Sequence, residues 1–347
     1  MHGWLILDKP VGPSSTQALG AVKRRLREAG YPKPKIGHGG TLDPLASGVL
    51  PIALGEATKL TGRMLDADKV YDFTIRFGEE TDTLDGEGTV VATSPNRPTL
   101  AEIKAVLASF TGPIEQVPPA YSALKVDGER AYKLARAGAE VELKTRAVTV
   151  HSLQILPGTG RGTSQRLVEG LALTPEQPLH RPAAPADGQV RLAPRAEAMS
   201  GGHGDLPIPP RTGEDFVTLS ATVSKGTYIR SLARDIARAL DSVGQVTMLR
   251  RTKAGPFSLD KAISLDKLGE AAKGRTLEQH LLPLTAGLDD IPALSVSPDQ
   301  ARALRQGRTL AGIAAKPGLL LATDADGPVA LVELREDVLR VVRGFNL

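Results

Sequence analysis

Cysteine is absent from this 347-residue sequence, and aromatic residues make up only 3% of it. Disulfide scaffolds, thiolate zinc sites, iron–sulfur clusters and cysteine nucleophiles all need a thiol, so each of these is excluded. No apolar run reaches the roughly 18–20 residues that cross a bilayer, and the first ten residues lack the pattern of a signal peptide. The composition therefore predicts a soluble, cytoplasmic protein without a membrane partner.

Charge is abundant but unevenly placed. The formal net charge is only +4, yet residues 1–36 and residues 225–253 each carry +5, while residues 66–88 carry −6. Two basic segments suggest one cationic surface, and such a surface suits a polyanion, most simply a nucleic acid. The alternative is that these Lys and Arg residues only form solvated helix faces.

The order of the patterns indicates two domains. Residues 157–213 contain nine Gly and nine Pro but no aromatic residue, which is typical of a long surface insertion that buries little apolar area. Strands and helices mix irregularly in residues 1–284, and this favours an α+β domain with a mixed or antiparallel sheet flanked by helices. Residues 285–347 are expected to form a small β-rich module.

Local patterns predict the main elements. Ser15 or Thr16 is expected to cap an amphipathic helix, and an Asp85-Gly86 turn is expected to close a hairpin. A helix that begins at Thr227 has an apolar stripe and places an arginine every four residues beside it. The other predicted elements are strands at residues 4–7, 70–77, 146–156 and 216–223, a helix at 100–110, and a C-terminal helix near 298–306 that is followed by strands at 319–321, 329–334 and 338–342.

The most unusual segment is the glycine-rich stretch Gly37–Gly48, expected to be a loop, which holds one carboxylate, Asp43, and one histidine, His38. Glycines allow a backbone to approach a ligand closely. The spacing matches neither phosphate-binding glycine motif, and no second metal ligand stands nearby. An Asp-Pro turn without function, a phosphate cradle and a metal site all remain open from the residues alone.

Five motifs resemble those of the bacterial tRNA pseudouridine-55 synthase (TruB) family. Read on through Lys59, the glycine-rich segment resembles the family's catalytic motif. The others are, in chain order, Leu7–Ser15, Tyr71 with Gly78–Gly88, Pro118–Tyr132, and Ser224–Leu232 with Leu249–Arg251. They cover residues 1–155 and 215–265, and the C-terminal module resembles, more weakly, the small RNA-binding barrel called PUA.

The resemblance implies three catalytic residues. Asp43 would be the nucleophile, which attacks either C1′ of the ribose or C6 of the uracil. Arg230 would hold its carboxylate by a two-point guanidinium contact. Tyr71 would stack on the flipped uracil and assist removal of the proton at C5. Taken alone, Arg230 would be a surface cation of its stripe and Tyr71 a core tyrosine.

Four further residues are implied in substrate binding. His38 would fill the space that the extruded base leaves, and Leu249 would form an apolar wall around that base. Tyr228 is assigned through its motif, and Lys9 would be either structural or phosphate-facing. Val223 stands where the family commonly has a non-catalytic cysteine.

The expected substrate is the T stem–loop of tRNA, held through phosphates and recognised mainly by shape. The two basic segments would flank the groove that holds it. The resemblance implies no metal, no cofactor and no protein partner, and a monomer. Two alternatives remain: a guide-dependent, dyskerin-like RNA pseudouridine synthase, and an RNA-binding or RNA-folding protein with a vestigial active site.

Overall fold

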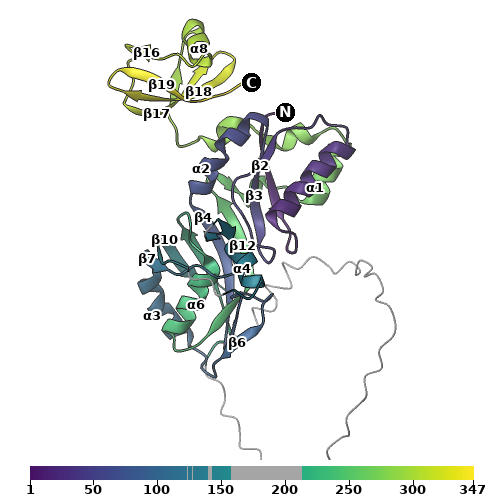
Figure 1. The fold of residues 1–347 in the computed structure, drawn as a ribbon, viewed down its shortest axis with the longest axis vertical. Helices are drawn as coiled ribbons and strands as arrows, with labels where there is room; N and C mark the ends of the chain where they lie inside the picture. Colours follow the sequence, from purple (N-terminus) through teal and green to yellow (C-terminus); the bar gives the residue numbers. More distant parts are fainter. Residues whose placement is uncertain (123, 127, 140–142, 158–212) are drawn as a thin grey trace, which may run out of the picture.

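The computed structural model describes residues 1–122, 124–126, 128–139, 143–157 and 213–347. A long sheet runs through the molecule with helices against it, and a smaller β-rich module lies beyond one end (Figure 1). The predicted insertion at 157–213 falls almost wholly outside the described residues. Within them, no helix is long and apolar enough to cross a membrane.

The main sheet has ten strands, and a single short parallel contact joins its two halves. That contact pairs Arg250 with Ser47 and Arg251 with Gly48; the other named strand pairs of this sheet are antiparallel. The predicted mixed sheet is therefore confirmed. In spatial order the strands are β14 (Leu281–Leu282), β1 (Gly3–Lys9), β3 (Ser47–Leu54), β12 (Gly244–Ala254), β4 (Lys69–Phe77), β11 (Phe216–Val223), β10 (Arg146–Ile155) and β7 (Gly112–Gln116), while β13 (Phe257–Ser258) pairs with β12 and β2 (Ile36–His38) with β3.

Both faces of this sheet are covered by helices. The side chains of β1 point alternately to the two faces and lie in two different buried clusters. Leu5 and Leu7 belong to one buried cluster, whereas Trp4 and Ile6 belong to another, as the period of two in a strand requires. The first cluster packs the helices α1 (Ser15–Glu28), α3 (Leu100–Leu107), α6 (Ile229–Ala239) and α7 (Leu265–Lys273) on one face, and the second packs η1 (Gly55–Leu60) and α2 (Thr61–Asp66) on the other.

Helix boundaries differ slightly from the predictions. The N-cap of α1 is Ser14, one residue earlier than expected, because its side chain and that of Gln17 form a reciprocal capping box. Helix α6 begins at Ile229, with Tyr228 as its N-cap. Thr227 precedes the helix, and its hydroxyl donates a hydrogen bond to the Ser224 carbonyl at 3.0 Å.

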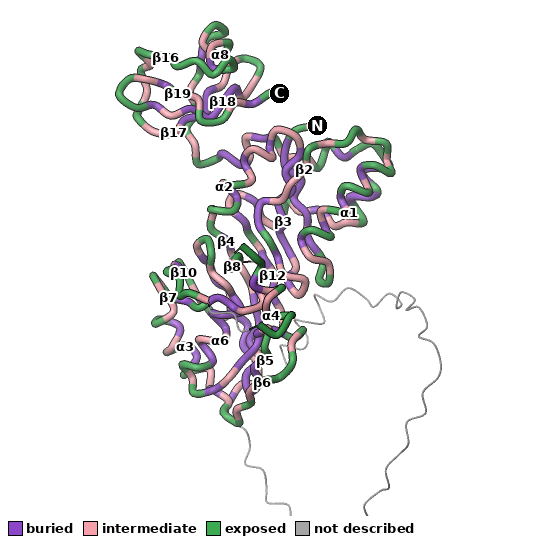
Figure 2. The backbone as a smooth tube through the Cα atoms, in the orientation of Figure 1, coloured by how far each residue is buried: buried purple, intermediate pink, exposed green. Residues whose placement is uncertain are grey.

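The predicted hairpin around the Asp85-Gly86 turn is present as a separate two-stranded sheet. Strand β6 (Val90–Thr93) pairs with β5 (Glu79–Thr81) and not with β4, because β4 is already flanked by β12 and β11. The short β8 (Lys125–Val126), β9 (Glu129–Arg130) and α4 (Ala131–Arg136) are more exposed than the central strands (Figure 2). The short helices are η2 (Ala108–Phe110), η3 (Leu259–Lys261), η4 (Leu277–His280) and η5 (Leu284–Gly287).

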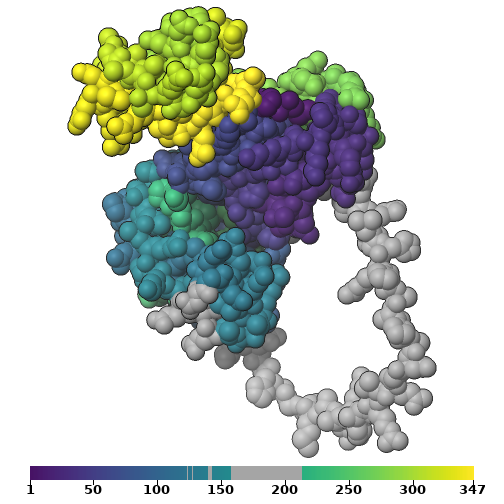
Figure 3. Space-filling model, turned by 45° about the horizontal axis from the view of Figure 1, so that its top comes forward, coloured from purple at the N-terminus to yellow at the C-terminus, as the bar shows by residue number. Residues whose placement is uncertain are grey.

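The C-terminal module has its own five-stranded sheet and its own buried cluster. Its Phe345, Leu321 and Leu331 also pack into the second cluster of the main domain, and Lys59 donates to the Gly344 carbonyl at 2.8 Å. Figure 3 shows the module seated against the N-terminal part of the chain. The expected boundary at residue 284 stays a prediction. The elements of the module are β15 (Ala293–Ser295), α8 (Pro298–Arg305), β16 (Leu310–Ala311), β17 (Gly318–Asp324), β18 (Gly327–Arg335) and β19 (Val338–Gly344).

Folding changes the meaning of the second basic segment. Strands β12 and β4 pair along their length, which brings residues 225–253 against the acidic residues 66–88. The prediction that this segment flanks an RNA-binding groove stays a prediction, but most of its cations meet carboxylates or backbone carbonyls of the protein itself, although the Lys225 and Arg238 side chains stay 64% and 56% exposed. The pairs are Lys225 with Asp66, Arg230 with Asp43 and Asp85, Arg234 with Asp235, Arg238 with Glu80, and Arg250 with Asp8, while Arg251 is buried.

Candidate active site

The glycine-rich segment lies at the seam between the two halves of the sheet. Strand β2 extends to His38 and β3 begins at Ser47, so the loop is shorter than predicted and comprises residues 39–46. Gly48 has a φ of +102°, and a Cβ atom there would lie 2.1 Å from the Arg251 carbonyl oxygen. Only glycine allows this close approach of β3 to β12, and it fixes where the loop ends.

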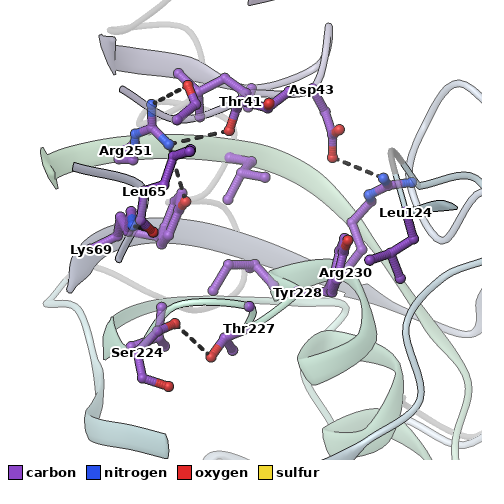
Figure 4. A pocket seen from close by; sticks show the side chains of 18 of the residues that line it. Thr41, Asp43, Leu65, Lys69, Leu124, Ser224, Thr227, Tyr228, Arg230 and Arg251 are labelled. Atoms are coloured by element: carbon purple, nitrogen blue, oxygen red, sulfur yellow. Dashed lines mark hydrogen bonds and ion pairs between the residues drawn. The ribbon is translucent and has the colours of Figure 1, made fainter. Parts of the chain in front are cut away.

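Asp43 points from this loop toward Arg230 of α6. The Asp43 Oδ2 atom lies 2.8 Å from Arg230 Nη2, as the dashed contact in Figure 4 shows. The Asp43 side chain is 38% exposed, whereas that of Arg230 is only 5% exposed. A buried guanidinium thus holds a carboxylate that solvent, or a substrate, can reach.

The guanidinium also has partners besides Asp43, and the expected two-point contact with Asp43 stays a prediction. Arg230 Nη1 lies 3.2 Å from Asp85 Oδ2 and donates to the Thr83 carbonyl at 2.7 Å, while Nη2 also donates to the Tyr121 carbonyl at 2.9 Å. Asp85 is itself buried, with 3% of its side chain exposed. The Arg230 side chain is therefore fixed from several directions.

Asp85 is held in turn by its own segment. Its Oδ1 atom accepts hydrogen bonds from the Thr83 hydroxyl at 2.6 Å and from the Glu87 amide at 3.1 Å. Burial, followed by the charges of Asp85 and Asp43, raises the pKa of Glu87. Three carboxylates thus share the neighbourhood of one buried arginine.

Arg251 holds the glycine-rich loop by hydrogen bonds to backbone carbonyls. Its side chain is buried, and it donates from Nε to the Val49 carbonyl at 2.8 Å and from Nη1 to the Thr41 carbonyl at 3.2 Å. Nη1 also lies 3.5 Å from the Tyr71 hydroxyl, and the guanidinium carbon is 6.0 Å from the centre of the Tyr71 ring. One side chain therefore positions both the glycine-rich loop and Tyr71.

These residues surround a cavity of about 340 Å³. Tyr71 from β4 and Leu249 from β12 line it together with Asp43 and Arg230, and Leu249 is nearly buried. Tyr228 also lines it; its amide donates to Gln116 Oε1 at 2.7 Å, and burial raises the pKa of its phenol. Five of the seven expected site residues thus meet in one cavity, although their roles stay predictions.

Lys9 and His38 do not line this cavity. The Lys9 ammonium donates to the Pro10 and Pro13 carbonyls at 2.8 Å each and lies 3.5 Å from the Pro44 carbonyl oxygen. Lys9 has no exposed surface, and burial lowers its pKa to about 8. This geometry favours the structural alternative, in which Lys9 fixes the turn beside Asp43, and the assignment of Lys9 to substrate binding stays a prediction.

His38 ends β2, opposite Ile52 of β3, just before the loop. Burial lowers its pKa, and its Nδ1 atom is buried with no hydrogen-bond partner among the described residues. Its expected role, to fill the space that the extruded base leaves, stays a prediction.

Asp85, Arg251 and Lys69 were missed as site residues. Asp85 lies in a motif that the sequence presented as a turn, and Arg251 is the last residue of the Leu249–Arg251 motif, in which only Leu249 was given a role. Lys69 lines the cavity and donates to the Leu65 carbonyl at 2.7 Å; burial lowers its pKa to about 8. Among the described residues, no group of three or more His, Cys, Asp or Glu is placed to hold a metal ion.

Comparisons with solved structures agree with this fold. An H/ACA ribonucleoprotein bound to a substrate RNA containing 2′-deoxyuridine has a chain that matches with a TM-score of 0.63 at 22% identity, covering 99% of this chain and 85% of that one. An archaeal box H/ACA Nop10–Cbf5 complex matches with a TM-score of 0.61 at 21% identity, covering 99% and 86%. At such identities the likeness concerns the fold alone.

Sequence comparisons are more specific. The family model described as "TruB family pseudouridylate synthase (N terminal domain)" matches residues 24–167, and that of the tRNA pseudouridylate synthase B C-terminal domain matches residues 230–289. A protein of Novosphingobium aromaticivorans named tRNA pseudouridine synthase B is 55% identical, over 100% of this chain and 98% of the relative. One of the same name from Zymomonas mobilis is 51% identical over 100% and 96%. This chain belongs to the TruB family of pseudouridylate synthases.

Proposed function

We propose that the protein isomerises uridine 55 in the T-loop of tRNA to pseudouridine, with Asp43 as the nucleophile. The observation that carries the proposal is the exposed Asp43 carboxylate, held at 2.8 Å by the buried Arg230 inside a cavity of about 340 Å³. Full-length relatives at 55% and 51% identity, both named tRNA pseudouridine synthase B, support tRNA as the substrate.

The reaction needs no net gain or loss of atoms. The bond between N1 of the uracil and C1′ of the ribose breaks, the uracil turns while it stays bound, and a bond from C5 to C1′ forms. The proton on C5 is then removed, and N1 gains one. Asp43 forms a transient bond to C1′ or to C6 and leaves again.

The residues around Asp43 suit these steps. Tyr71 offers a ring face for the flipped uracil, and Leu249 offers an apolar wall beside it. Tyr71 would also assist removal of the C5 proton, while Arg251 holds its hydroxyl at 3.5 Å. Arg230 supplies orientation, because a carboxylate held at a fixed angle loses less freedom when it attacks.

We further propose that the chain works as a monomer in the cytoplasm, without a cofactor, a guide RNA or a protein partner. The C-terminal module would contact RNA in the manner of a PUA barrel. The solved structures that match belong to H/ACA complexes, which is the reason to keep the guide-dependent alternative in the test.

The test uses the purified chain and an unmodified tRNA transcript in buffer with a chelator. We expect one T-loop uridine to be converted, detected by carbodiimide treatment with primer extension and by mass spectrometry. Asp43→Asn should abolish turnover while tRNA binding persists; Asp266→Asn, which changes an exposed carboxylate in the first turn of α7, should leave it unchanged.

Each alternative has its own outcome. Conversion that appears only after a guide RNA is added would favour the dyskerin-like reaction. Binding of tRNA without any conversion by the unaltered chain would favour a vestigial active site. Substantial turnover by Asp43→Asn would remove Asp43 from the nucleophilic role.

A further inference from the structure

The described part of the chain keeps one strongly cationic groove free of ion pairs. It has a volume of about 630 Å³ and lies between the exposed side of α1 and residues 31–36, the segment that leads into β2. Five exposed cations line it: Lys23, Arg24 and Arg27 from the helix, and Lys33 and Lys35 from the segment.

No carboxylate lines this groove, and none of its five cations forms an ion pair with another described residue. Glu28, the acidic residue of α1, is instead directed to Arg25, at 3.9 Å. Arg275, which stacks on the Tyr31 ring with its guanidinium carbon 5.0 Å from the ring centre, adds a further positive charge at this end. The contrast with residues 225–253, where acids neutralise most cations, is sharp.

The groove is connected to the active site through both of its walls. The first residue of α1, Ser15, donates from its hydroxyl to the Leu42 carbonyl at 3.0 Å and accepts from the Leu42 amide at 2.7 Å. Lys23 and Arg27 stand 8 and 12 residues further along α1, about 12–18 Å at 1.5 Å per residue. The other wall continues through β2 directly into the catalytic loop.

We infer that this α1 groove is a docking site for the phosphate backbone of the RNA, separate from the cavity that receives the target base. This rests on the proposed function, because it assumes that RNA occupies the catalytic cavity. Lys and Arg side chains without internal partners can contact phosphates and release counterions, whereas paired ones must first give up a carboxylate.

The inference is tested by salt dependence, because each phosphate contact contributes about 0.9 to the slope of log Kd against log salt for a duplex. Filter binding of the tRNA transcript is measured in the Asp43→Asn background, so that no turnover occurs. The groove variant Lys23→Ala/Arg27→Ala is compared with Lys104→Ala/Lys253→Ala. This control removes the same charge from two exposed lysines outside the groove.

For the groove variant we expect the slope to fall by about 2, so that raising salt from 50 to 200 mM weakens its binding about tenfold less than that of the control. Lys33→Ala/Lys35→Ala, on the opposite wall, should reproduce the effect. In chains with an intact Asp43, the same substitutions should raise KM and leave kcat unchanged. A circular dichroism melt guards against misfolding.

Equal slopes and equal Kd values for groove and control variants would overturn the inference, whatever else binds in the groove. Failure of the proposed function is distinguishable, since it appears as an unaltered chain that converts no uridine. The salt slopes of the binding-only chains would still report on the groove in that case.

Discussion

Substitution of Asp85 by Asn tests whether Arg230 must be held from behind to serve Asp43. The two side chains are 3% and 5% exposed, and Asp85 Oδ2 lies 3.2 Å from Arg230 Nη1. Asparagine keeps the shape and can still accept from the Thr83 hydroxyl through Oδ1, but its NH2 group then faces Arg230, so the change removes both the charge and the contact to the guanidinium. A hydrogen bond to a charged group contributes about 1.5–3 kcal/mol.

If all of that energy serves to aim Arg230 at Asp43, kcat should fall by about 10- to 150-fold, at 1.36 kcal/mol per tenfold. Binding of tRNA should change little, because Asp85 is not exposed to it. The assay is single-turnover conversion of the tRNA transcript at saturating enzyme, with Kd measured separately. Urea unfolding supplies the accompanying loss of stability.

Glu80→Gln is the matched control, because Glu80 of β5 pairs with Arg238, which lies on the same helix as Arg230. Glu80 is also buried and pairs with Arg238 at 2.8 Å, but the Arg238 side chain is 56% exposed and stands eight residues beyond Arg230, about 12 Å along α6. We expect Glu80→Gln to lower stability without lowering kcat. Equal losses of kcat in both variants, or an unchanged kcat in Asp85→Asn, would refute the reasoning.

Two further predictions concern Tyr71 and Lys9. Tyr71→Phe should lower kcat by about 10²–10⁴-fold if the hydroxyl assists proton transfer, with an unchanged Kd for tRNA; a kcat near that of the unaltered chain would leave only stacking for Tyr71. Lys9→Met concerns stability: burial lowers the pKa of Lys9 to about 8 from 10.5, so between these pH values the unfolded chain holds a proton that the folded chain has released. The unfolding free energy of the unaltered chain therefore rises with pH in this window relative to that of Lys9→Met. In urea titrations we expect the difference between the two chains to grow by about 3 kcal/mol from pH 8 to 10.5. A constant difference would show that Lys9 is not desolvated.

Elements with a strong period were predictable from the sequence. The strand at 70–77 and the helix near 298–306 lie within a residue of β4 and α8. Each shows the spacing of apolar residues that its own type of element requires for burial. The hairpin partner of β6 was not predictable, because pairing within a sheet depends on which strands flank β4.

The site was predictable only through resemblance. Arg230, Arg234 and Arg238 repeat every four residues and look alike in the sequence, yet Arg230 alone is directed to Asp43. That difference is created by the register of α6 against the sheet. Asp85 was read as a turn residue, since Asp-Gly is a common turn pair and its burial is set by a distant helix.

Charge shows why a local count misleads. Residues 225–253 and 1–36 each carry +5, yet residues 225–253 fold against the acidic residues 66–88 through β12 and β4, and most of their cations pair with carboxylates of the protein. Helix α1 instead packs its apolar side on the sheet and turns Lys23, Arg24 and Arg27 outward, where the described residues offer them no carboxylate. Because electrostatic attraction to RNA depends on charges that remain unpaired after folding, the two segments contribute unequally. The salt dependence of tRNA binding should therefore respond to neutralisation of α1 and of residues 33–35, and much less to loss of the exposed Lys253.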